Sequence, residues 1–267
     1  MLNSLRQLFR SKPSTRQPAV PEGSRYYVIG DIHGRHDLFR AMVDAIEADD
    51  AELPPADTTV VLLGDLVDRG PDSAGVIATT KEWQKKRNIR ILAGNHEEMF
   101  LESFEDIDVL RHFLKHGGRE TVMSYGLSKK QFNAMTLEEL FAMLPQLVSQ
   151  AERDYVAGFE ELIVAGDYLF VHAGIDPLIP IDAQKRKDLL WIRDRFLKHE
   201  GPLEKVVVHG HTIFDRVMDC GNRIGIDTGA FRSGVLTALV LEQDQRRILQ
   251  AIDEDGIIEI FNGDKAR

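Results

Sequence analysis

Five short polar turns concentrate the residue types that bind metal ions in proteins. Five of the nine histidines in the 267-residue chain fall in these turns, beside aspartates and an asparagine. Carboxylate, imidazole and amide donors together suit manganese, iron or zinc, whereas calcium prefers oxygen donors alone. The turns therefore predict a transition-metal site. They read Gly30-Asp31-Ile32-His33-Gly34, Gly64-Asp65-Leu66-Val67-Asp68-Arg69-Gly70, Gly94-Asn95-His96-Glu97, Val171-His172-Ala173-Gly174 and His209-Gly210-His211-Thr212.

The spacing of the first turn favours a site with two ions. Asp31 and His33 are two residues apart, so strand geometry continued through Ile32 would point both side chains the same way, toward one ion. Two cations about 3.5 to 4 Å apart need an anionic bridge between them. Asp65 ends the next predicted strand and is the natural bridging carboxylate. The pattern thus predicts a dinuclear centre that shares Asp65.

The elements that position these turns alternate between apolar runs and amphipathic stretches. This order indicates a mainly parallel sheet with crossover helices in the first half of the chain. Ligands of such sheets lie beyond the carboxyl ends of the strands, so we expect segments 31–35, 65–70 and 95–97 to converge. The predicted strands are 26–30, 58–64 and 89–94, and the predicted helices are 38–48, 73–86 and 96–104.

The second half of the chain is predicted to be rich in strands. Before it, residues 105–150 read as a helical insertion without evident chemistry, interrupted by Gly117-Gly118 and Pro145. A further helix is expected over 183–197. The predicted strands are 162–165, 168–173, 205–208, 223–226, 235–241, 247–252 and 257–261.

In this order the five turns resemble the motifs of the metallophosphoesterase superfamily, and specifically those of bacterial and phage serine/threonine protein phosphatases. The resemblance runs from Tyr26 to about Leu241. It implies an α/β fold, a calcineurin-like four-layer αββα sandwich in which two packed mixed β-sheets are flanked by helices. It also implies one catalytic domain, residues 25–267, and two divalent metal ions, with Mn²⁺ expected and iron, zinc or nickel as alternatives.

The resemblance also implies which residues bind the metals. The first ion would be held by Asp31, His33 and Asp65. The second would be held by Asp65, Asn95, His172 and His211. A hydroxide that bridges the two ions would then attack phosphorus directly, because paired metals lower the pKa of bound water.

Four further residues are expected to act on the substrate. His96 follows a metal ligand and is the best general acid for the leaving alkoxide, with Asp68 holding its other ring nitrogen. Arg69 and Arg193 would bind the phosphoryl oxygens, for which the guanidinium fork is suited. Arg193 lies in a segment, residues 190–194, that resembles the family's second phosphate-binding segment. Without the resemblance, a solvated or ion-paired arginine is the simpler interpretation of Arg193.

Three functions remain open at this point. The first is a phosphomonoesterase that acts on phosphoproteins or phosphopeptides, with Ser/Thr and dual specificity both open. The second is a symmetrical bis(5'-nucleosyl)-tetraphosphatase, since residues 117–125 resemble segments of both groups. Those hydrolases tend to carry a non-acidic residue at the position of Asp68 and Asp at that of Glu97, which favours the phosphatase. The third, a non-catalytic binding module, should lack a ligand, the acid or the arginine, and all are present.

Composition argues against nucleic-acid binding and against a membrane span, and it indicates the cellular compartment. The formal net charge of −10 argues against nucleic-acid binding, which needs a basic face. No apolar run reaches the roughly 18 residues of a membrane span. The single cysteine, Cys220, forms no internal disulfide and fits a reducing compartment, so a cytoplasmic location is expected. Residues 1–24 read as a basic, disordered leader, with a membrane or partner anchor as the alternative.

Several polar residues receive structural rather than catalytic interpretations. Glu97 is expected to cap or orient a neighbour, and His209 either supports the site or ends a strand. Asp227 lies in a segment, 227–229, that resembles one near the family's site, but a turn is the simpler interpretation. The remaining histidines are expected at the surface or at helix caps: His36, His112, His116 and His199.

Overall fold

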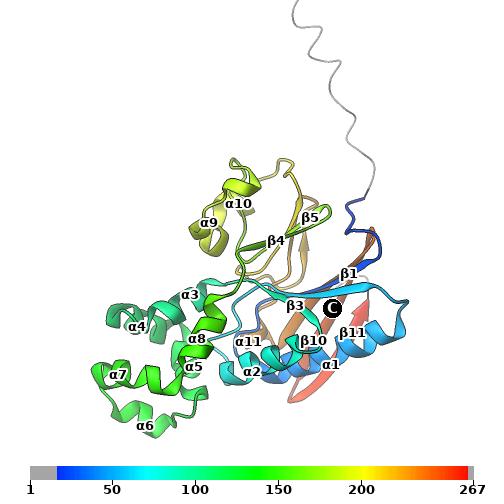
Figure 1. Ribbon diagram of the computed structural model, residues 1–267. Coiled ribbons are helices and arrows are strands. Elements are labelled where there is room, and N and C mark those ends of the chain that lie inside the picture. The colour runs from blue at the N-terminus through cyan, green and yellow to red at the C-terminus, as the bar shows by residue number, and fades with distance from the viewer. Residues whose placement is uncertain (1–16, 264–267) are drawn as a thin grey trace, which may run out of the picture.

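Two β-sheets lie against each other with helices on their outer faces in the computed structural model, which describes residues 17–263 (Figure 1). The alternation of side chains along the strands produces these layers. Val28 faces the second sheet, in a cluster with Phe170 and Val208, whereas Tyr27 and Ile29 face the helices. The predicted four-layer αββα sandwich of two mixed sheets is therefore confirmed.

The first sheet has six strands in the order β11-β10-β9-β1-β2-β3. Strands β1, β2 and β3 are parallel, as predicted, but every other pair is antiparallel. The parallel sheet expected for the first half of the chain is thus confirmed, and the carboxyl-terminal meander makes the whole sheet mixed by joining the edge of β1. The strands are β1 (Ser24–Ile29), β2 (Asp57–Leu62), β3 (Asn88–Ile91), β9 (Val235–Glu242), β10 (Gln245–Glu254) and β11 (Ile257–Gly263).

The second sheet has five strands in the order β4-β5-β6-β8-β7. Strands β5, β6 and β8 are parallel, so their carboxyl ends share one edge. The two-residue strand β7 was not predicted, since it is too short to show a pattern. The strands are β4 (Leu162–Ala165), β5 (Tyr168–Val171), β6 (Val206–His209), β7 (Met218–Asp219) and β8 (Arg223–Gly225).

Helices cover the outer face of each sheet. Helices α1 (His36–Glu52) and α2 (Ser73–Gln84) cover the first, and α9 (Arg186–Trp191) and α10 (Asp194–Leu197) cover the second. The single helix predicted over 183–197 is wrong. A 3₁₀ turn, Ile181–Ala183, precedes α9, and Ile192 (ψ 142°) with Arg193 (ψ −103°) separates α9 from α10.

The helical insertion lies to one side of the sheets, next to α3 (Asn95–Glu102) and α8 (Gln150–Ala157) (Figure 1). Its predicted helical character is confirmed. The interruption at Gly117 is real, since φ there is 110°, whereas Pro145 lies inside the last helix without ending it. The insertion comprises α4 (Ile107–Phe113), the π-helical turn η1 (Leu114–Gly118), α5 (Arg119–Ser124), α6 (Lys129–Ala134) and α7 (Leu137–Leu147).

The end of the predicted leader packs onto the body. Val20 is buried and its N–H donates to the carbonyl of Gln243, while the Ala19 N–H donates to Asp167. The predicted disorder therefore does not extend to residue 24, and residues 1–16 lie outside the described part. Within 17–263, no helix is both long and apolar enough to cross a membrane.

Candidate metal centre and active site

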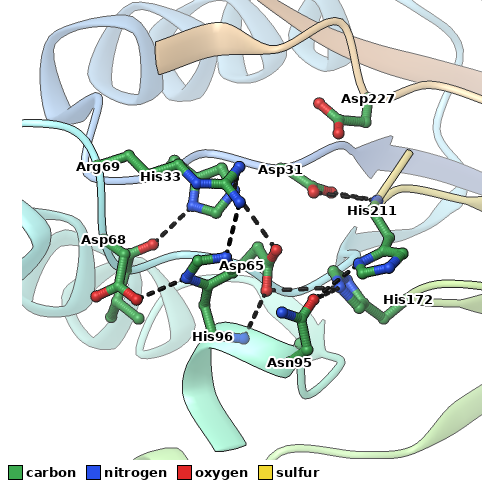
Figure 2. A network of polar contacts seen from close by, with 12 residues as sticks. Asp31, His33, Asp65, Asp68, Arg69, Asn95, His96, His172, His211 and Asp227 are labelled. Carbon is green, nitrogen blue, oxygen red and sulfur yellow. Dashed lines mark hydrogen bonds and ion pairs between the residues drawn. The ribbon is translucent and has the colours of Figure 1, made fainter. Parts of the chain in front are cut away.

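The predicted donor residues follow strands from both sheets and meet at one place (Figure 2). Asp31, Asp65 and Asn95 come after β1, β2 and β3, while His172 and His211 come after β5 and β6. The structure therefore brings together segments nearly 180 residues apart. All six predicted donors are buried: Asp31, His33, Asp65, Asn95, His172 and His211.

The turns that carry these donors have unusual backbone geometry. Among the described residues, seven non-glycine residues have positive φ, and five of them belong to the predicted site. Such conformations cost about 1–3 kcal/mol each and cluster at functional sites. The expectation that strand geometry continues through Ile32 is wrong, because β1 ends at Ile29 and His33 has φ 46°. The five residues are His33, Asp65, Asp68, Arg69 and His211.

Asp65 is shared by two groups of donor atoms. His33 and His96 form one group with it, His172 and His211 the other, and the donor atoms of each group lie within 4.8 Å of one another. Its Oδ2 lies 3.4 Å from His33 Nε2, and its Oδ1 lies 3.5 Å from His172 Nε2. The two carboxylate oxygens thus face different groups, which is the arrangement that a bridging ligand requires.

The imidazole rings are oriented so that lone pairs face the centre. Nδ1 of His33 lies 2.8 Å from the Val67 carbonyl, and Nδ1 of His172 lies 2.8 Å from the Leu63 carbonyl. A ring whose Nδ1–H donates to a carbonyl keeps Nε2 free as a metal ligand. Burial lowers the pKa of both rings and lowers that of His211 to about 2, so all three are neutral imidazoles, the form that binds metals.

Asn95 joins the second group. Its Oδ1 lies 3.0 Å from His172 Nε2 and 2.8 Å from His211 Nδ1. Nε2 of His211 is buried and has no hydrogen-bond partner among the described residues. An amide oxygen and two imidazoles therefore converge on one side of Asp65.

Asp31 lies outside both donor groups and instead faces Asp227. Its carboxylate accepts from the His211 N–H at 3.0 Å. Burial, together with the charges of Asp227 and Asp65, raises the pKa of Asp31, and burial raises the pKa of Asp227 to about 6. Oδ2 of Asp227 is buried without a partner (Figure 2). The interpretation of Asp227 as a plain turn residue missed this, although its resemblance to a family segment was the signal.

This arrangement fits divalent cations. Three buried carboxylates and three neutral imidazoles surround one region, and carboxylates buried close together are unfavourable without a compensating cation. The unpartnered Asp227 Oδ2 is an atom that such an ion would satisfy, and Nδ1 of His211 lies beside Asn95 Oδ1 as a further donor. The residues can therefore hold metal at two places on either side of Asp65.

His96 and Asp68 form a buried pair beside the donors. His96 Nδ1 lies 2.6 Å from Asp68 Oδ2, and its backbone N–H donates to Asp65 at 3.0 Å. Burial lowers the pKa of His96, but the negative charges of Asp65 and Asp68 outweigh it and raise the pKa overall. The pair is thus built to hold a proton on the ring.

The two predicted arginines differ in their contacts. Arg69 donates to His33 Nε2 at 2.8 Å and to His96 Nε2 at 2.9 Å, and its guanidinium lies 4.8 Å from the centre of the Phe231 ring. The Arg193 side chain is exposed and makes no polar contact with the described residues, and its charge adds to the effect of burial, which lowers the pKa of His172 and His211. Both cations therefore lie near the centre, and that of Arg193 is free.

Glu97 and His209 have structural roles. The buried carboxylate of Glu97 accepts the N–H groups of Gly94 (2.9 Å), Asp65 (2.8 Å) and Leu66 (2.8 Å). It thus orients the turn that carries Asp65, as expected. His209 packs against Phe196 and Phe214 and contributes to neither donor group.

Comparisons with known proteins agree with this geometry. Residues 24–230 match the family described as calcineurin-like phosphoesterase. The chain is 30% identical over 236 residues to serine/threonine-protein phosphatase 2 of Escherichia coli, covering 84% of this chain and 97% of that protein. It is 26% identical to an asymmetrical bis(5'-nucleosyl)-tetraphosphatase of Bacillus velezensis, covering 79% and 87%. A solved cold-active protein tyrosine phosphatase shares the fold, with TM-score 0.56, 17% identity and coverage of 91% and 81%.

Proposed function

The chain belongs to the calcineurin-like phosphoesterase family, and from this membership we propose that it is a phosphoprotein phosphatase that removes phosphate from serine and threonine. The observation that carries the proposal is the pair of donor groups sharing Asp65 beside the buried pair of His96 and Asp68. Residues 25–267 would act as one catalytic domain.

The donor groups would hold two divalent cations, for which we propose manganese. Asp31, His33 and Asp65 would bind one, and Asp65, Asn95, His172 and His211 the other. When bound, the cations supply Lewis acidity toward the phosphoryl oxygens and the attacking water.

His96 would give its proton to the departing alkoxide. A serine or threonine alkoxide is a poor leaving group, so protonation lowers the barrier to its departure. Asp68 fixes the ring through Nδ1, and Nε2, which lies 2.9 Å from Arg69 in the structure, would face the substrate once Arg69 turns to the phosphoryl group. The charges of Asp65 and Asp68 outweigh the effect of burial and raise the pKa of the ring, which favours its protonated form.

The arginines would bind the phosphoryl group. The lone pair of His33 Nε2 cannot both accept from Arg69 and bind a cation, so Arg69 must release it when the metal is present. Its guanidinium is then free to donate to phosphoryl oxygens, stacked on Phe231. Arg193, whose side chain has no partner among the described residues, would donate from the break between α9 and α10.

Two observations bear on the substrate. The bacterial protein phosphatase is similar over nearly its whole length, and Asp68 is present and paired with the proposed acid. The second candidate is dinucleoside tetraphosphate hydrolysis, favoured by the similarity to the Bacillus velezensis enzyme. That relative is named an asymmetrical hydrolase, whereas residues 117–125 of this chain resemble a segment of the symmetrical hydrolases.

One experiment separates these functions. Protein stripped with chelator and reloaded with Mn²⁺ is offered p-nitrophenyl phosphate, phosphoseryl and phosphotyrosyl peptides, and diadenosine tetraphosphate in parallel. We expect cleavage of the nitrophenyl ester and the phosphoseryl peptide. Exclusive cleavage of the dinucleotide would replace the proposed substrate, and inactivity on all four would favour a binding module.

A further inference from the structure

The helical insertion reaches into the site at one turn. The sequence showed no chemistry in residues 105–150, yet two residues of the insertion hydrogen-bond to the turn that carries Asp68 and Arg69. One is Thr121 of α5, and the other is Gly117 in the π-helical turn η1. Both bonds cross from the insertion to the loop after β2.

The turn that they hold is strained. Asp68 has φ 74° and Arg69 has φ 69°, so two consecutive non-glycine residues occupy the left-handed region. Single residues visit this region, but successive ones need support from their surroundings. The Asp68 N–H donates to Thr121 Oγ1 at 2.8 Å and to Ser73 Oγ at 3.0 Å, and the Arg69 N–H donates to the Gly117 carbonyl at 3.0 Å. The insertion therefore binds both amides of the strained pair.

Thr121 also fixes the side chain of Asp68. Its hydroxyl donates to Asp68 Oδ1 at 2.7 Å, while Oδ2 faces His96 Nδ1 at 2.6 Å. Thr121 and Asp68 are both completely buried, so this hydrogen bond is shielded from solvent. One threonine thus sets the rotamer of the carboxylate that orients the proposed acid.

Gly117 lies in close contact with Arg69. A Cβ at this position would lie 2.6 Å from the Arg69 backbone nitrogen and 2.7 Å from its Cγ, and the φ of 110° also favours glycine. The chain is kinked here between α4 and α5, since His116 and Gly117 have non-helical dihedral angles. The close approach places the insertion directly against the base of the Arg69 side chain.

We propose that Thr121 and Gly117 are positioning residues, through which the helical insertion assembles the acid pair and the phosphate-binding arginine. This inference rests on the roles proposed above for Asp68, His96 and Arg69. Thr121 acts through the pair and so governs kcat for poor leaving groups, whereas Gly117 acts through Arg69 and so governs KM.

The first test replaces the Thr121 hydroxyl and keeps its shape. Thr121→Val should lower kcat for a phosphoseryl peptide by about 10- to 100-fold, part of the roughly 10²- to 10⁴-fold that a positioned acid supplies. The loss with p-nitrophenyl phosphate, whose phenolate needs little protonation, should be only a few-fold, and KM should stay within about twofold. Thr121→Ser, which keeps a hydroxyl, should restore most of the loss.

Thr80→Val is the matched control. Thr80 is equally buried, and its hydroxyl donates to the Val76 carbonyl of its own helix at 2.8 Å, away from the acid pair. This variant should leave the ratio of the two kcat values unchanged. Equal losses on both substrates in Thr121→Val, or the same change in the control, would overturn the proposal.

A readout without turnover separates this inference from the proposed function. In metal-free protein labelled with ¹⁵N-histidine, the Nδ1 proton of His96 should move upfield in Thr121→Val and stay in place in Thr80→Val. An unmoved resonance would overturn the role of Thr121, even for a protein that cleaves no phosphomonoester.

Gly117→Ala tests the second contact. It should raise KM by about tenfold, the value of one charge-assisted hydrogen bond, and an unchanged KM would refute the role of Gly117.

Discussion

The strand-end turns and the helical insertion contribute to the same site in different ways. The turns supply donor atoms, such as the two Asp65 oxygens that face His33 and His172. The insertion makes three hydrogen bonds, two through Thr121 and one through Gly117, to a turn that it does not itself contain. Donors are recognisable by residue type, whereas positioning groups are recognisable only by geometry. Variants of the predicted donors in the strand-end turns should therefore lose metal ions, whereas variants in the insertion should keep the metal ions and lose the correct position of the acid pair or of Arg69.

The largest effect is expected at the donor that both groups share. Asp65→Asn keeps the shape of the side chain but removes the charge between the two groups, so metal content should fall from two ions per chain. Activity should drop by more than about 10⁴-fold, since metal catalysis is worth several kcal/mol. Elemental analysis after desalting measures the ions, and two retained ions would refute the shared role.

A smaller and more selective effect is expected at the acid pair. His96→Asn should keep both metals yet lose about 10²- to 10⁴-fold in kcat on phosphoseryl peptides. The loss with p-nitrophenyl phosphate should be smaller, because its leaving group is stable without a proton. Steady-state kinetics on both substrates gives the comparison, and equal losses would count against proton donation.

The free arginine offers a still smaller effect. Arg193→Ala should raise KM for phosphomonoesters by about tenfold, because a hydrogen bond to a charged group contributes about 1.5–3 kcal/mol. The melting temperature should not change, since this side chain is exposed and makes no polar contact with the described residues. A lowered melting temperature with unchanged KM would mark Arg193 as structural.

The smallest effect on activity is expected far from the site. Asp49 accepts from Arg247 at 2.9 Å, and although burial raises its pKa, the bonds from Arg247 and Tyr27 lower it overall. A carboxyl whose pKa is lower in the folded state than in the unfolded state stabilises the folded protein at pH values above its unfolded-state pKa, near 4. This stabilisation is lost as the pH falls through the folded-state pKa.

Asp49→Asn should therefore lower the melting temperature at pH 7 and flatten its decline below about pH 4. Melting curves across this range check the prediction, with kcat at pH 7 as the activity measurement. A variant with wild-type acid sensitivity would show that this carboxyl contributes nothing.

The resemblance of the five turns implied the sandwich, whereas the strands and the converging donors were predictable from local signals. Strand runs alternate in a regular way, and donor types recur at strand ends, as at Asp65 and His172. The geometry of the first turn was not predictable, since His33 is held in a left-handed conformation by contacts with the Asp65 turn. The break at Ile192 and Arg193 in the helix predicted over 183–197 was also missed, because neither isoleucine nor arginine excludes a helix.

The remaining differences between the predictions and the structure concern residues whose contacts lie far away in the sequence. Asp227 resembles an ordinary turn residue until β8 brings it next to Asp31. Thr121 resembles any helical threonine until α5 meets the loop after β2. Such residues have common types and no informative spacing, so only the folded chain reveals what they contact.

The most direct test of the shared Asp65 is anomalous diffraction from crystals grown with Mn²⁺. We predict two manganese peaks, one beside each oxygen of Asp65, with His33 on one side and His172 and His211 on the other. A single peak, or two peaks of which neither contacts Asp65, would contradict the account.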